Sequence, residues 1–126
     1  MFTGIVQGIA QVEGIEDRSG LRSLRLKFPS GFDAGLQIGA SVAVDGVCLT
    51  ASALHDGAAV FDVMQQTLAV TTLGGLRAGD RVNVERAAKE GAEVGGHVLS
   101  GHVDAQATIA LIRAPENNRV LRIALP

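Results

Sequence analysis

The sequence has no tryptophan, no tyrosine and only four phenylalanines among its 126 residues. Positive charge is not in excess either, because 11 Lys and Arg face 13 Asp and Glu, for a formal net charge of −2. Proteins that bind nucleic acid combine clustered basic side chains with aromatic rings that stack on bases. Both features are scarce here, so we expect no nucleic-acid partner.

Cysteine and long apolar runs are scarce as well. A single cysteine, Cys48, excludes an internal disulfide and a cysteine-based zinc site. No stretch approaches the roughly 20 consecutive apolar residues of a membrane span, and the N-terminus lacks the basic segment of a secretory signal peptide. We therefore expect a cytoplasmic protein with no membrane partner.

Glycine, in contrast, is abundant, at 16 residues, and 47% of the chain is hydrophobic. The glycines separate short runs in which apolar and polar residues alternate, a pattern typical of half-buried strands joined by tight turns. The clearest runs are Leu24–Phe28, Val42–Val44, Val60–Val63 and Val82–Val84. One short helix is predicted after Met64, ending at Gly74-Gly75. The sequence therefore predicts an all-β fold.

An internal repeat emerges when the chain is aligned with itself at an offset of 97 residues. Residues 3–29 and 100–126 then share 8 identities in 27 positions, where chance would give one or two. The matches include Gly4 with Gly101, Arg22 with Arg119 and Leu24 with Leu121. The repeat predicts a first barrel module over residues 1–97 and the first strands of a second, truncated module over residues 98–126.

Cys48 is the first candidate for chemistry. It follows the turn signal Asp45-Gly46 and shares one face of the next strand with Thr50. A free cysteine is most often a small buried hydrophobe, and it becomes a nucleophile only where a neighbour deprotonates the thiol. Histidine is the side chain best suited to that task.

His97 and His102 are the histidines to consider. They lie five residues apart, which suits neither one face of a helix nor one face of a strand, so a metal site is set aside. His102 and Asp104 share strand parity, and a carboxylate could orient the imidazole as a general base. An ordinary pair of surface polar residues on a strand fits the spacing equally well.

Phosphate chemistry is not supported, because the chain contains neither a P-loop nor a dinucleotide-binding glycine motif. Several neutral or acidic side chains would instead suit a polyol or a uracil-like ring. These are Ser41, Thr50, Asp62, Gln65, Gln66 and Thr67.

Taken together, the longer motifs resemble riboflavin synthase of the α-chain type. The resemblance rests on MFTGIV, VDGVCLT, FDVMQQTL, TTLGGLRAGDRVNVERA, GGHVLSGHVDA and ENNR, which run in this order from end to end. It implies a six-stranded antiparallel Greek-key barrel, followed by the start of a second barrel of the same topology. Members of this family continue beyond the position of Pro126, so we expect the chain to be part of a longer enzyme.

The resemblance also implies an activity. Two molecules of 6,7-dimethyl-8-ribityllumazine would dismutate to riboflavin and 5-amino-6-ribitylamino-uracil, without cofactor or metal. It implies a homotrimer whose active sites lie between barrels of neighbouring subunits, and lumazine synthase as a candidate partner. The alternative is a lumazine- or flavin-binding module of the same barrel family that lacks catalysis.

By the same resemblance, Cys48 and His102 are the expected catalytic residues, with His102 as the base and Cys48 as nucleophile or proton shuttle. The substrate-binding residues that it implies lie at the chain start, on the barrel strands, and at the seam between the modules. They are Phe2, Thr3, Gly4, Ile5, Val6, Ser41, Thr50, Asp62, Met64, Thr67, His97 and Val103.

Overall fold

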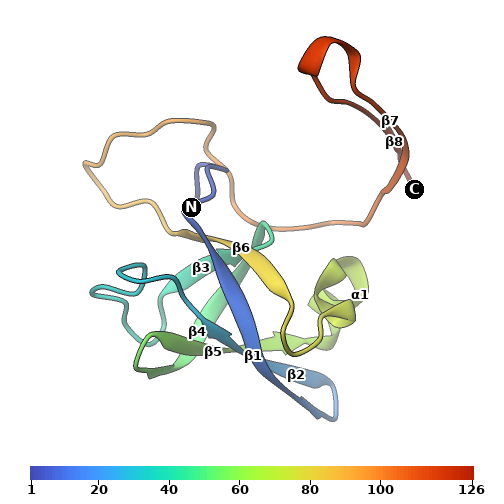
Figure 1. Ribbon diagram of the computed structural model, residues 1–126. Helices are drawn as coiled ribbons and strands as arrows, with labels where there is room; N and C mark the ends of the chain where they lie inside the picture. Colours follow the sequence, from blue (N-terminus) through green and yellow to red (C-terminus); the bar gives the residue numbers. More distant parts are fainter.

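A computed structural model describes residues 1–126, and six of its strands close into an antiparallel barrel (Figure 1). The barrel strands are β1 (Gly8–Arg18), β2 (Leu21–Lys27), β3 (Ser41–Val44), β4 (Val47–His55), β5 (Ala58–Met64) and β6 (Arg81–Arg86). Their order around the barrel is β1-β2-β5-β4-β3-β6. Because β2 lies beside β5 rather than β3, the topology is a Greek key. The predicted all-β Greek-key barrel is confirmed.

The barrel interior is filled by the apolar residues of the alternating runs. Leu24, Leu26, Phe61, Val63 and Val84 are at most 1% exposed. Each such side chain contributes about 1.5–3 kcal/mol on burial, whereas exposed ion pairs contribute about 0–1 kcal/mol. The core therefore dominates stability. Its side chains fill the barrel interior, so any ligand site must lie on the outer face of the barrel.

A two-residue turn fixes the face on which Cys48 lies. Asp45 (φ +48°) and Gly46 (φ +81°) both have positive φ, which is the requirement of a type I′ hairpin turn. The turn pairs Val44 with Val47, so Val47 and Leu49 point into the core. Cys48 and Thr50 consequently point outward, and their predicted shared face is confirmed.

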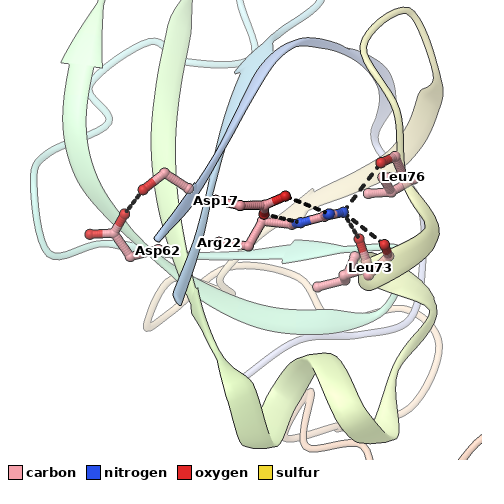
Figure 2. Close-up of polar contacts among 7 residues, drawn as sticks. Asp17, Arg22, Asp62, Leu73 and Leu76 are labelled. Atoms are coloured by element: carbon pink, nitrogen blue, oxygen red, sulfur yellow. Dashed lines mark hydrogen bonds and ion pairs between the residues drawn. The ribbon is translucent and has the colours of Figure 1, made fainter. Parts of the chain in front are cut away.

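The helix predicted after Met64 is present as α1 (Gln65–Val70), followed by the 3-10 turn η1 (Thr72–Gly75). Arg22 fastens this region to the β1–β2 hairpin (Figure 2). Its Nη1 donates to the carbonyls of Gly74 (2.8 Å) and Leu76 (3.3 Å), and its Nε donates to Asp17 Oδ1 at 2.7 Å. The side chain of Arg22 is only 17% exposed, so the chain beyond α1 is held by a largely buried side chain.

The hydrogen bond from Arg22 lowers the pKa of Asp17 below the usual aspartate value of 3.8, against a smaller opposing effect of desolvation. A carboxyl whose pKa is lower in the folded state adds stability above its unfolded pKa, and this is lost as the pH falls through the folded value. We therefore expect Asp17→Asn to flatten the decline of stability below about pH 4. The effect should be small, because the Asp17 side chain is 63% exposed.

Urea unfolding of both proteins from pH 6 to pH 2.5 measures this difference. Asp56→Asn is the matched control, because Asp56 is exposed and its carboxylate has no hydrogen-bond or ion-pair partner. Identical acid profiles for the Asp17 and Asp56 variants would contradict the assigned role of the Arg22 contact.

A second, smaller sheet lies apart from the barrel (Figure 1). It consists of β7 (Thr108–Arg113) and β8 (Val120–Ala124), joined through the 3-10 turn η2 (Pro115–Asn117), and every residue of both strands is exposed. Ile109 pairs with Ile123 and Ile112 with Leu121, with an irregularity between Ile109 and Leu111.

The β1–β2 hairpin has the same pairing 97 residues earlier in the chain. Val12 pairs with Leu26 and Ile15 with Leu24, with an irregularity between Val12 and Gly14. The two hairpins therefore share both register and bulge at the spacing of the sequence repeat.

None of the helices is long and apolar enough to span a membrane.

Candidate functional site on the outer face of the barrel

The N-terminal segment and the chain beyond β6 lie together on the outer face of the barrel. Phe2 N donates to Leu99 O (2.7 Å), Leu99 N donates to Phe2 O (2.9 Å), and His97 N donates to Thr3 O (3.0 Å). Phe2 is only 2% exposed although it lies outside the barrel core. These contacts bring two segments almost 100 residues apart over one side of β3, β4 and β6.

Glu85 holds the N-terminal segment in place. Its carboxylate accepts hydrogen bonds from Thr3 N (2.7 Å), Thr3 Oγ1 (3.0 Å) and Gly4 N (3.0 Å), and the residue is 5% exposed. A buried carboxylate is costly unless such donors satisfy it. This contact could not be predicted from the sequence, because an acidic residue at an outward strand position is most often solvated.

Gly101 brings the second segment onto Cys48. Cys48 N donates to Gly101 O at 2.9 Å. A Cβ added to Gly101 would lie 2.7 Å from Cys48 Cβ and 3.0 Å from a ring carbon of Phe2. Gly101 also has a φ of +82°, a region that favours glycine. Only glycine allows the chain to pass this close to Cys48.

A cavity of about 240 Å³ opens beside this contact. It is bounded by the start of β4, by α1 and its end, and by the segment that follows Gly101. Its lining residues are Val47, Cys48, Gln66, Thr67, Val70, Thr71, Gly101, His102, Val103 and Asp104. The structure thus places Cys48 and His102 on the walls of one cavity.

A second cavity of about 180 Å³ shares part of its lining with the first. Phe2, Gly4 and Glu85 line it, and Gly101 and His102 belong to both cavities. Four residues predicted for the site therefore meet in the first cavity, namely Cys48, Thr67, His102 and Val103. Phe2 and Gly4 join His102 in the second.

A strip of polar side chains continues from Cys48 along the outside of the barrel. Ser41 pairs with Thr50, the next outward residue after Cys48 on β4. Asp62 lies on the outer face of β5 and accepts a hydrogen bond from Ser23 Oγ at 2.5 Å (Figure 2). Met64 ends β5 and is 61% exposed. These residues line neither cavity, and they form an open surface beside the first one.

The remaining predicted residues lie on the N-terminal side of the site. Ile5 and Val6 are about half exposed, and Thr3 is bound to Glu85. The His97 side chain is exposed, and its backbone is bound to Thr3. The structure does not bring these four residues into the cavity of Cys48.

The expected strand around His102 and Asp104 is absent. Residues 100–107 belong to no strand, so the parity argument for this pair is wrong. Both side chains nevertheless line the same cavity, although no hydrogen bond joins them. The chain leaves the sheet here because it crosses from the barrel to the β7–β8 hairpin.

Chemically, the first cavity offers a thiol, an imidazole, a carboxylate and the side-chain amide of Gln66. Val47, Val70 and Val103 supply apolar surface between them. A pocket of this kind suits a flat heterocycle with polar edges, which apolar walls can contact and the polar groups can orient. No group of three or more His, Cys, Asp or Glu side chains is arranged to hold a metal ion.

The structure defines a class of protein, namely small Greek-key barrels with a candidate ligand site on the outer surface. The defining features are the barrel, the cavities outside it and the two segments that lie over Cys48. The sequence pattern of the lumazine binding domain matches residues 3–87. The chain belongs to this lumazine-binding domain family.

Individual relatives agree with this assignment. Riboflavin synthase of Escherichia coli (strain K12) is 47% identical over 119 residues, which cover 94% of this chain and 56% of that protein. Riboflavin synthase of Mycobacterium bovis is 45% identical over 128 residues, which cover 100% of this chain and 63% of that protein. The chain thus spans little more than half the length of these relatives.

Among solved structures, LumP complexed with 6,7-dimethyl-8-(1'-D-ribityl) lumazine superposes with a TM-score of 0.88. It is 28% identical, and the match covers 100% of this chain and 69% of LumP. LumP complexed with riboflavin gives a TM-score of 0.87 at the same identity.

Proposed function

We propose that this chain contributes the lumazine-binding barrel of a riboflavin synthase. The reaction would convert two molecules of 6,7-dimethyl-8-ribityllumazine to riboflavin and 5-amino-6-ribitylamino-uracil. The observation that carries the proposal is the meeting of Cys48 and His102 in one cavity outside a barrel of this family. The identity to riboflavin synthases supports it.

In this proposal His102 removes a proton from the acidic ring methyl of one lumazine and leaves a delocalised anion. Cys48 or water adds to the second lumazine and makes it electrophilic, so that the anion can attack it. Two C–C bonds form between the ring systems and the two ring C–N bonds that held the four-carbon unit break, so that the donor leaves as 5-amino-6-ribitylamino-uracil and the added nucleophile departs. Holding two rings in register supplies much of the acceleration, because effective molarities of about 10⁵–10⁸ M are available to oriented reactants.

We assign the polar strip and the N-terminal side of the site to the ring and ribityl chain of the substrate. Ser41, Thr50, Asp62 and Thr67 offer oxygen atoms to the polyol, while Met64 and Val103 offer apolar contact. Phe2, Thr3, Gly4, Ile5, Val6 and His97 form the N-terminal side. The support is their common position around the two cavities and on the outer face beside them.

We further propose that residues 1–97 form one lumazine-binding barrel and that residues 98–126 form the first strands of a second barrel of like topology. The shared register and bulge of the two hairpins support this division. The proposal includes a homotrimer that completes each site with a neighbouring barrel, association with lumazine synthase, and a cytoplasmic location. The reaction as written needs no cofactor.

A second function is favoured by a specific observation, the likeness to LumP with bound lumazine or riboflavin. The chain could serve as a lumazine- or flavin-binding module without catalysis. The same experiment separates the two functions.

The polypeptide that carries this sequence is mixed with 6,7-dimethyl-8-ribityllumazine, and absorbance and fluorescence are followed. One riboflavin formed for every two lumazines consumed is the result expected of the synthase. Tight binding without conversion would establish the binding module instead. Absence of both binding and conversion would overturn both proposals.

A further inference from the structure

The segment from Gly101 to Gln106, here called the strap, crosses the first cavity between two anchors. At one end, Gly101 O accepts the hydrogen bond from Cys48 N on β4. At the other end, Gln106 Nε2 donates to the carbonyl oxygen of Thr71 at 2.8 Å. His102, Val103 and Asp104 line the cavity between these two points. The strap therefore spans from the strand that carries Cys48 to the end of α1.

Few other contacts hold the strap. From His102 to Ala107, no backbone group is hydrogen-bonded to another backbone group, and His102 N donates only to Ser100 Oγ, at 3.1 Å. Val103 packs at the margin of the hydrophobic core. Segments with so few contacts open locally at low free-energy cost. The amide of Gln106 is thus the polar contact that fixes the second half of the strap.

The partner of Gln106 is a rigid point. Thr71 is 4% exposed, and its hydroxyl donates to Thr67 O at 2.7 Å. Arg22 fastens the residues just after it. Carbonyls at the end of a helix lack partners within the helix, so the side chain of Gln106 satisfies a group that would otherwise be buried without a partner.

We propose that Gln106 is a positioning residue, whose amide closes the strap onto Thr71 and thereby holds His102 on the cavity wall facing the site of Cys48. The consequence for ligand binding rests on the proposed function. The closure itself is a property of the free protein. It can therefore be tested without any ligand.

Cys48 is the only thiol of the chain and lines the cavity under the strap, so its rate of alkylation by iodoacetamide reports opening. Gln106→Met removes the donor at similar length, and Gln106→Glu removes it with an added charge. Loss of one neutral hydrogen bond should raise the alkylation rate about three- to tenfold in both variants. Gln37→Glu is the matched control, because Gln37 is exposed and its side chain has no hydrogen-bond partner. Its alkylation rate should equal that of the unchanged protein.

A purely structural role would lower the thermal unfolding midpoint, and we expect the Gln106 variants to unfold within a few degrees of the control. A strap that is mostly closed in the unchanged protein stays mostly closed in the variants, so their affinity for 6,7-dimethyl-8-ribityllumazine should fall by less than the factor by which alkylation rises. Unchanged alkylation in both variants, or a change in Gln106→Glu alone, would overturn the role of the Gln106 amide. If the unchanged protein binds no lumazine, the proposed function fails. The alkylation rates still test whether Gln106 holds the strap closed.

Discussion

Replacing His102 by glutamine is expected to lower the rate of riboflavin formation by about 10²- to 10⁴-fold, the usual contribution of a positioned general base. Glutamine retains hydrogen-bonding capacity but cannot take a proton from the ring methyl. Cys48→Ser should lower the rate about tenfold or more, because a hydroxyl is a weaker nucleophile than a thiolate. Steady-state assays of riboflavin formation, on the polypeptide that carries this sequence, measure both effects.

Substrate affinity separates chemistry from binding in this experiment. Both substitutions keep the cavity walls nearly unchanged in volume, so the dissociation constant for lumazine should move by no more than a few-fold. His55→Gln makes the same chemical change at an exposed position at the end of β4, far from the cavity lining, and should leave the rate unaltered. Near-normal turnover in both the His102 and the Cys48 variants would refute their catalytic assignment.

The strands were predictable because each is buried on one side only. Leu24 and Leu26 alternate with exposed residues at the period of the pleat, and Asp45-Gly46 marks its hairpin by local turn chemistry alone. The order of the strands was not encoded locally. The pairing of Leu24 with Phe61 joins residues 37 positions apart, and the Greek-key order of the strands could be expected only from the resemblance to a known family.

The candidate site, like the fold, was predictable from the sequence only in part. That Cys48 and Thr50 share one face of β4 was correctly predicted from the turn signal before them, and the structure shows that this face points outward. The segments that cover Cys48 were beyond local reasoning, because Phe2 meets Leu99 and Thr3 meets Glu85 across more than 80 residues. His102 and Asp104 were assigned to a strand by their alternation, yet an extended segment without a partner strand has the same alternation.

Gly101→Ala should be the most damaging substitution outside the catalytic pair. A positive φ costs an alanine about 1–2 kcal/mol, and this alone would be tolerable. The added Cβ, however, would lie 2.7 Å from Cys48 Cβ and 3.0 Å from the ring of Phe2, a buried residue. Both neighbours are held by backbone hydrogen bonds, to Gly101 and to Leu99, so the strap must move away from β4.

Displacement of the strap removes one wall of the cavity together with His102. We expect the affinity for 6,7-dimethyl-8-ribityllumazine to fall about 30- to 100-fold, the equivalent of about 2–3 kcal/mol. Fluorescence titration measures this loss. Urea unfolding of the same samples measures the accompanying destabilisation, which should exceed the cost of the backbone angle alone.

Gly31→Ala isolates that backbone cost. Gly31 has a φ of +83°, almost equal to that of Gly101, and a Cβ added there would meet no atom within 4 Å. It should therefore lose about 1–2 kcal/mol of stability from the angle and keep its affinity for the lumazine. Equal losses of affinity in the two variants would show that the close approach of Gly101 to Cys48 does not shape the site. A selective loss in Gly101→Ala would show that the strap must rest on β4 for the ligand to bind.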